Sequence, residues 1–175
     1  MGEYIFKQTR IGKDGKPFLM FKFRTMRLGA EEEKIRYLNL NEADGPVFKI
    51  KDDPRFTKFG KILAYTGIDE LPQLINIIRG EMSLVGPRPL PVDEEREIPS
   101  QWRQKRNSVK PGITSSWAIN GTHSLSFSEW MELDMQDICN KSIFYDAMII
   151  FKTFWLLLIN VFRLIFDFRH YLRIF

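Results

Sequence analysis

The first 26 residues alternate between hydrophobic and polar positions with the period of β-strands. Two strand-like runs, residues 4–11 and 17–26, are joined by a four-residue turn whose Asp-Gly pair favours a tight bend with positive φ. In the second run one face is apolar and the other carries Lys22 and Arg24. The pattern predicts a β-hairpin, and the simplest interpretation of the two cations is a solvated strand face.

Beyond the hairpin the pattern becomes mainly helical. Helices are predicted over residues 30–40 and 57–65, separated by a short apolar strand over 46–50 that Asp-Asp-Pro ends. Ser126-Phe127-Ser128-Glu129 has the spacing of a capping box and predicts a helix through about residue 140. The side chains expected on the buried face of this helix are Trp130, Met131, Met135 and Ile138.

The segment from Thr66 to Gly80 carries a stronger helical signal. Pro72 is tolerated only in the first turn of a helix, and Gly80 favours a C-terminus. A helix in this register places Asp69 and Glu70 at its start. Its apolar positions fall on one face, namely Leu71, Leu74, Ile75 and Ile78.

Two adjacent carboxylates at a helix start are a candidate ligand site. Side chains at neighbouring positions of a regular helix diverge, but at the terminus Asp69 and Glu70 can converge beside free backbone N–H groups. A divalent cation and a phosphate both suit such a place. The alternative is that the two acids only offset the helix dipole.

Arg88 follows shortly after this helix, between Pro87 and Pro89. The two prolines fix φ on either side and restrict the residue before each of them, so Arg88 is held stiffly. A rigid guanidinium near paired carboxylates suits the binding of phosphate oxygens. By spacing alone, such a Pro-Arg-Pro segment is more often a simple turn.

The tail, residues 147–168, consists almost entirely of large apolar residues. Its longest charge-free run, 153–162, has ten residues, about half of the roughly 20 that a membrane-spanning helix needs. The interruptions share one narrow helical stripe, and they are Lys152, Asn160, Arg163 and Asp167. This pattern favours a helix that lies in a membrane interface, and the alternative is a helix buried between two copies of the chain.

Composition narrows the class of protein. The 175 residues are 44% hydrophobic and 14% aromatic, which excludes a disordered chain. A single cysteine, Cys139, excludes a disulfide framework, and without a cleavable signal peptide the chain is expected to face the cytoplasm. His123 and His170 have no partner at ligand spacing, so a histidine metal site is not expected.

The net charge of +4 is unevenly distributed along the chain. Residues 1–29 carry a net +5, residues 30–146 a net −4 and residues 147–175 a net +3. Basic ends around an acidic middle suit an anionic membrane surface at least as well as a nucleic acid. The elements together predict an α+β fold, with a catalytic domain over 1–146 and a membrane-associating helix over 147–175.

Six ordered motifs resemble those of the bacterial sugar transferase superfamily, the monotopic phosphoglycosyl transferases. They are residues 6–12, 22–26, 53–55, 69–74, 82–89 and 110–114, which read FKQTRIG, KFRTM, DPR, DELPQL, MSLVGPRP and KPGIT. The resemblance implies transfer of a sugar 1-phosphate from a UDP-sugar to undecaprenyl phosphate, with release of UMP, at the start of surface glycan synthesis. It also implies a location on the cytoplasmic face of the bacterial inner membrane, and it leaves association between copies of the chain open.

The resemblance assigns roles to residues of this chain. It implies that Asp69 is the nucleophile that forms an aspartyl-phosphosugar intermediate, that Glu70 is its partner and that Mg²⁺ sits against both. Arg88 is implied to grip phosphate. Further candidates are Lys22 and Arg24 for phosphate binding, and Asp146, Pro87 and Pro89 for support.

The chain departs from the family pattern at four places. The family has a hydrophobic re-entrant helix before the hairpin, which the 175 residues do not include. Ala64 stands in place of an arginine, Gly67 in place of a serine, and Thr122 in place of a second arginine, after residues 115–118 that also differ. The two missing cations favour an alternative, a catalytically impaired scaffold of the same fold. A basic nucleic-acid-binding module is a further alternative, but no recognised motif supports it.

Overall fold

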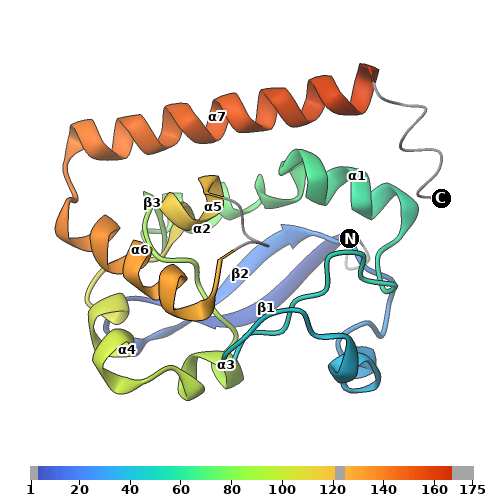
Figure 1. Cartoon of the computed structure of the whole chain (residues 1–175), viewed down its shortest axis with the longest axis horizontal. Helices are drawn as coiled ribbons and strands as arrows, with labels where there is room; N and C mark the ends of the chain where they lie inside the picture. Colours follow the sequence, from blue (N-terminus) through green and yellow to red (C-terminus); the bar gives the residue numbers. More distant parts are fainter. Residues whose placement is uncertain (1–3, 121–124, 167–175) are drawn as a thin grey trace.

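The computed structural model describes residues 4–120 and 125–166, and it has the predicted α+β fold. Two two-stranded sheets lie among short helices, and one long helix runs along one side of the molecule (Figure 1). The first sheet is the predicted antiparallel hairpin of β1 (Ile5–Ile11) and β2 (Pro17–Phe23). Its turn uses positive φ at Asp14 and Gly15, as the Asp-Gly pair predicts.

The inner face of the hairpin is the face that carries the cations. Phe18 and Met20 are buried in a small core with Met82, whereas Leu19 on the opposite face is 41% exposed. Because side chains alternate along a strand, Lys22 points to the same side as Met20. The interpretation of Lys22 as a solvated side chain is therefore wrong, since only 15% of its side chain is exposed.

Two predicted elements after the hairpin differ in the structure. A 3₁₀ helix, η2 (Glu32–Leu40), replaces the expected polar α-helix. The predicted strand over residues 46–50 is a loop. The side chain of Asn41 explains the loop, because it donates to the carbonyls of Ala43 and Val47 and accepts from the amide of Lys49. These backbone groups bond locally instead of joining a strand ladder.

The segment from Thr66 to Gly80 contains the end of one helix, a 3₁₀ turn and a short second helix. Helix α1 (Lys58–Thr66) starts at the N-cap Thr57 and ends at Gly67, which has a φ of +71°. The chain then forms a 3₁₀ turn, η3 (Ile68–Glu70), before the short helix α2 (Gln73–Ile78). Asp69 and Glu70 therefore lie in the 3₁₀ turn just before α2, which begins later, at Gln73, than the predicted helix start.

Helix α2 is oriented with its polar side inward. Gln73 and Asn76 are buried, whereas the predicted apolar face, Leu71, Leu74, Ile75 and Ile78, is 43–86% exposed. Asn76 joins α2 to the free edge of β2: its Oδ1 accepts from the amide of Phe21, and its Nδ2 donates to the carbonyl of Leu19. One side chain thus satisfies two strand groups and fixes α2 beside the hairpin.

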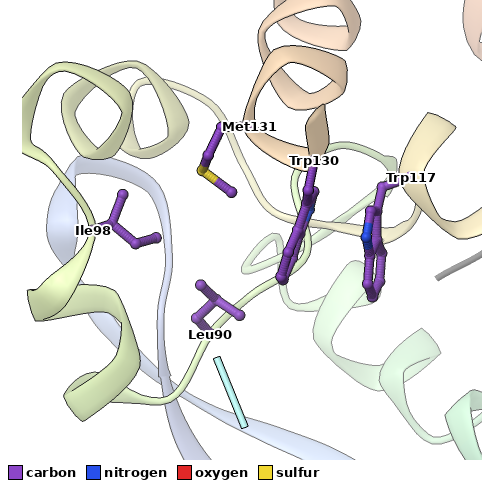
Figure 2. Close-up of a cluster of buried hydrophobic side chains, with 5 residues drawn as sticks. All are labelled: Leu90, Ile98, Trp117, Trp130 and Met131. Atoms are coloured by element: carbon purple, nitrogen blue, oxygen red, sulfur yellow. The ribbon is translucent and has the colours of Figure 1, made fainter. Parts of the chain in front are cut away.

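The remaining short elements form the main core. Strands β3 (Ser83–Val85) and β4 (Gly112–Thr114) pair in parallel, and α3 (Val92–Glu97) and α4 (Ser100–Asn107) lie on either side of Pro99. The next elements are α5 (Ser116–Ile119) and α6 (Phe127–Cys139), and α6 starts with the predicted capping box. Figure 2 shows the core cluster, which consists of Leu90, Ile98, Trp117, Trp130 and Met131.

The long helix is α7 (Ile143–Phe166), which begins four residues before the predicted boundary and contacts α1, α5 and both strands of the parallel sheet. Its inner side holds the buried Ile149 and two polar contacts: Thr153 bonds Thr114, and Asn160 donates to the carbonyl of Tyr65. The outer side is apolar and exposed at i+3, i+4 and i+7 intervals, namely Phe144, Met148, Phe151, Trp155, Phe162 and Phe166. Within residues 4–120 and 125–166, α7 is the one helix long and apolar enough to cross a membrane.

The contacts of Asn76 generate a stability prediction. Asn76→Ala should lower the free energy of unfolding by about 2–4 kcal/mol, because two strand groups lose their partners in a buried place. The measurement is urea unfolding at a fixed detergent concentration, with the exposed Asn39→Ala in η2 as the control. Equal stability of the two variants would show that Asn76 does not hold α2 on the hairpin.

Candidate active site

Asp69 and Glu70 converge on a single lysine. The Lys22 Nζ lies 2.6 Å from Oε1 of Glu70 and 3.7 Å from Oδ2 of Asp69. Arg88 reaches the same Oε1 atom at 3.5 Å. The 3₁₀ turn makes this convergence possible, because it presents both carboxylates towards the inner face of β2. Four of the predicted site residues, Asp69, Glu70, Arg88 and Lys22, therefore form one cluster.

The surroundings shift the pKa values of the two carboxyl groups in opposite directions. Burial raises the pKa of Asp69, and the charge of Glu70 adds to this effect, while Lys22 and Arg88 oppose it only in part. Burial also acts to raise the pKa of Glu70, but Lys22 and Arg88 outweigh it and lower that pKa overall. Glu70 is thus the stable anion of the pair, and Asp69 is the more basic carboxylate.

The loop that carries Arg88 is held in place by hydrogen bonds that its backbone carbonyls accept from other segments. The carbonyl of Pro87 accepts from the amide of Gly112, and that of Pro89 accepts from NH1 of Arg10. The carbonyl of Arg88 accepts from NH2 of the buried Arg106. A Cβ added at Gly112 would lie 2.1 Å from the Gly86 amide nitrogen, so glycine permits the close approach. Both prolines therefore act as support for Arg88.

The cluster lies in a cleft of about 1490 Å³. Ten Lys or Arg residues line the cleft against five Asp or Glu residues, so its field favours anions. Another part of its wall is apolar and comes from β3, β4, α7 and the residue after η3. The apolar lining residues include Leu71, Leu84, Ile113, Phe154 and Leu157. The cleft can therefore accept both a phosphorylated polar group and an apolar chain.

The other predicted site residues have different surroundings. Arg24 lines the same cleft and lies over the ring of Phe6 at 5.7 Å. Asp146 lies in the first turn of α7 and pairs with Lys141 at 3.6 Å, and it is not among the residues that line the cleft. Lys141 in turn donates to the carbonyl of Val85 in β3. Asp146 thus joins the start of α7 to the parallel sheet.

Two positions that depart from the family pattern also line the cleft. Ala64 lies on its wall. Gly67 adopts a left-handed φ of +71°, and a Cβ there would lie 2.8 Å from Leu157 of α7. The close approach of α7 and the positive φ together explain a glycine at this position. Thr122, like both histidines, lies outside the described residues.

Sequence reasoning missed several residues that shape the cleft. Lys49 and Trp117 both line it, and Arg10 and Arg106 hold the Arg88 loop. The sequence around each of these residues does not indicate a site, because each belongs to a different segment and they meet only in the folded chain. Asn76 was detectable in principle, since an amide inside an otherwise apolar helical run indicates a specific buried contact.

The oxygen donors of the cluster limit which metal it can hold. Among the residues that the structure describes, no group of three or more His, Cys, Asp and Glu side chains comes together. The dyad offers two carboxylates. This set fits Mg²⁺, which uses one or two carboxylates and completes its coordination with water and substrate phosphates.

The chain belongs to the bacterial sugar transferase family, whose pattern it matches over residues 1–160. It is 45% identical to galactosyl transferase CpsE of Streptococcus agalactiae over 91% of this chain. It is 39% identical to the UDP-glucose:undecaprenyl-phosphate glucose-1-phosphate transferase of Escherichia coli over 87% of this chain. The chain spans 35% and 32% of the length of these two relatives.

A shorter relative matches a larger share of its own length. Exopolysaccharide production protein ExoY of Rhizobium meliloti is 38% identical over 87% of this chain and 69% of its own length. The family match over residues 1–160 covers the hairpin, the dyad and the Arg88 loop of this chain. Family membership, predicted from the six motifs, is confirmed.

The raised pKa of Asp69 predicts a cost in stability. A carboxyl group whose pKa is raised by folding destabilises the folded state above that pKa, and the effect disappears as the pH falls and the group protonates. Asp69→Asn should therefore be at least as stable as the wild type at pH 7.5, and its advantage should shrink towards pH 5. Thermal unfolding across this pH range measures the difference. A larger loss of stability at pH 7.5 than in the exposed control Asp52→Asn would contradict the raised pKa.

Proposed function

We propose that this chain transfers a sugar 1-phosphate from a UDP-sugar to undecaprenyl phosphate, and that it acts in surface glycan synthesis. The observation that carries the proposal is the shared contact of Lys22 with two carboxylates of different basicity beside Arg88. Relatives named as undecaprenyl-phosphate transferases support the choice of reaction. The cleft agrees with it, because a basic wall and an apolar wall meet at the dyad.

In the proposed first step, a carboxylate oxygen of Asp69 attacks the sugar-linked phosphorus of the donor. The bond between this phosphorus and the oxygen that bridges the two phosphates breaks, and UMP leaves with the electron pair. Asp69 then carries the sugar phosphate as an acyl phosphate. Its raised pKa suits the role, because a more basic carboxylate is a better nucleophile.

In the second step, a phosphate oxygen of undecaprenyl phosphate attacks the same phosphorus. The bond to Asp69 breaks, and the product is an undecaprenyl diphosphate sugar. Lys22 and Arg88 are positioned to offset the negative charge on the phosphoryl oxygens in both steps. Glu70 keeps these two cations in place, because its lowered pKa leaves it ionised. Arg24, farther along the inner face of the hairpin, is proposed to hold another phosphate oxygen of the donor.

Asp69 and Glu70 are also the proposed ligands of Mg²⁺. The bound ion would neutralise charge on the donor diphosphate. Omission of Mg²⁺ should therefore weaken activity more strongly than it changes the stability of the protein. No other cofactor is proposed.

The proposed acceptor, undecaprenyl phosphate, is a lipid and therefore implies work at a membrane. We propose that α7 lies on the cytoplasmic face of the bacterial inner membrane, with its inner side on the domain and its outer side in the interface. The polar contacts of Thr153 and Asn160 support this orientation, because a helix held by the domain along one side cannot be surrounded by lipid. The exposed apolar face of α2 supplies a second surface of the same kind.

The decisive experiment measures UMP release from a panel of UDP-sugars with undecaprenyl phosphate, Mg²⁺ and detergent. The wild type should release UMP from at least one donor, and Asp69→Asn should lose at least about 10³-fold in rate, because its nucleophile is gone. Lys22→Met should lose roughly 10- to 100-fold, as expected for a lost charge-assisted contact. Asp52→Asn is the control.

Three other outcomes would each contradict a part of the proposed function. Release that Asp69→Asn retains would contradict the assigned nucleophile. A folded wild type that releases UMP from no donor would favour the catalytically impaired scaffold. Salt-sensitive binding to DNA, without binding to anionic liposomes, would favour a nucleic-acid-binding module instead.

The membrane surface gives a separate prediction. A double variant, Phe151→Ser with Trp155→Ser, should reduce sedimentation with anionic liposomes at least about tenfold, because two exposed apolar side chains of α7 no longer enter the interface. The matched control is Ile35→Ser with Leu38→Ser, which removes an equally exposed apolar pair from η2. Equal sedimentation of both double variants would contradict the role of α7.

A further inference from the structure

Trp117 is a rigid platform beside the candidate active site. Its ring stacks on that of Trp130 with a centroid distance of 4.3 Å and an interplanar angle of 16° (Figure 2). Both tryptophans are at least 93% buried as residues, within the main core. Because Trp130 covers one face of the Trp117 ring, the other face is left for the cleft, which Trp117 lines.

Two cations approach this platform. The Lys49 Nζ lies 5.1 Å from the centroid of the Trp117 ring, and the Arg88 guanidinium carbon lies 5.5 Å from it. Since Trp130 stacks on one face, both cations lie on the opposite side of the ring, and Arg88 is close enough to Lys49 to lower its pKa. The ring attracts each of them, but they repel one another. An anion with two charged groups would remove this repulsion.

The position of Lys49 is set by its backbone. Its amide donates to Oδ1 of Asn41, and its carbonyl accepts from the amide of Glu42. Burial and the charge of Arg88 lower the pKa of its ammonium group, and Glu42 raises it. Arg88 itself contacts Glu70 of the dyad. Lys49 is thus next to Arg88, and Arg88 in turn reaches the dyad.

We propose that Lys49 binds the donor diphosphate together with Arg88, where both cations lie against Trp117 in the wall of the cleft. Arg88, next to the dyad, holds the phosphate that is attacked, and Lys49 holds the phosphate that leaves as part of UMP. This inference rests on the proposed function for the identity of the donor. It assigns a substrate-binding residue in the loop over residues 46–50, outside the phosphate-binding set of Lys22, Arg24 and Arg88.

The charge state of Lys49 predicts that diphosphate affinity depends on pH. Burial and the neighbouring Arg88 lower the pKa of Lys49 to about 8. In the free protein Lys49 is therefore mostly charged at pH 7 and mostly neutral at pH 9. Diphosphate binding should weaken over this range in the wild type. An arginine at this position stays charged throughout, so the Lys49→Arg variant should lose this pH dependence.

The test is titration calorimetry of the full chain in detergent, at a fixed Mg²⁺ concentration, with UDP, inorganic pyrophosphate and uridine as probes. Lys49→Gln should bind UDP and pyrophosphate about 10- to 100-fold more weakly than the wild type, with uridine binding unchanged. The control is Lys16→Gln, which removes the same charge from the exposed hairpin turn. The affinity of Lys49→Arg for UDP and pyrophosphate should match that of the wild type at pH 7 and exceed it at pH 9. The ratio of the two affinities at one pH cancels the titration of the ligand itself.

The outcomes separate this inference from the proposed reaction. Equal affinities of Lys49→Gln and Lys16→Gln for pyrophosphate would overturn the inference, even if the wild type releases UMP. Lys49-dependent pyrophosphate binding in a chain that releases no UMP would support the inference and contradict the reaction. A wild type that binds neither UDP nor pyrophosphate would overturn both.

Discussion

The contact of Lys22 with two adjacent carboxylates is the constraint on which the site depends. Asp69 and Glu70 are largely withdrawn from water, and two such charges repel each other unless a cation lies between them. Lys22 occupies that position only because the hairpin register turns it to the inner face with Met20. A register shift of one residue would turn it to solvent. The hydrogen bonds of Asn76 to β2 fix the distance between the lysine and the 3₁₀ turn.

The distribution of polar and apolar side chains follows from the same arrangement. Helices α2 and α7 both place polar groups inward and expose large apolar groups, the reverse of a helix on a water-soluble protein. In α2 the inward amide of Asn76 serves the hairpin edge, and in α7 Thr153 and Asn160 serve β4 and α1. The exposed apolar faces suit the proposed contact with lipid, and relatives named as undecaprenyl-phosphate transferases support that proposal.

The parts of the structure that local chemistry determines could be predicted from the sequence. The Asp-Gly turn, the capping box of α6 and the rigid Arg88 loop each depend on residues a few positions apart, and all three are present. The prediction of a strand over residues 46–50 was wrong because the side chain of Asn41, which lies outside this segment, forms hydrogen bonds with its backbone groups. The orientation of α2 and the meeting of Lys49 with Arg88 on Trp117 depend on contacts between distant segments, which no local pattern encodes.

The central claim is that Asp69, held beside Glu70 by Lys22, forms a covalent bond to the transferred phosphate. The most direct measurement incubates the protein with a donor UDP-sugar and Mg²⁺ without undecaprenyl phosphate, and then maps the adduct by peptide mass spectrometry. The account predicts a sugar phosphate on Asp69, formed with one equivalent of UMP and removed when undecaprenyl phosphate is added. An adduct on another residue, or turnover without any adduct, would contradict it.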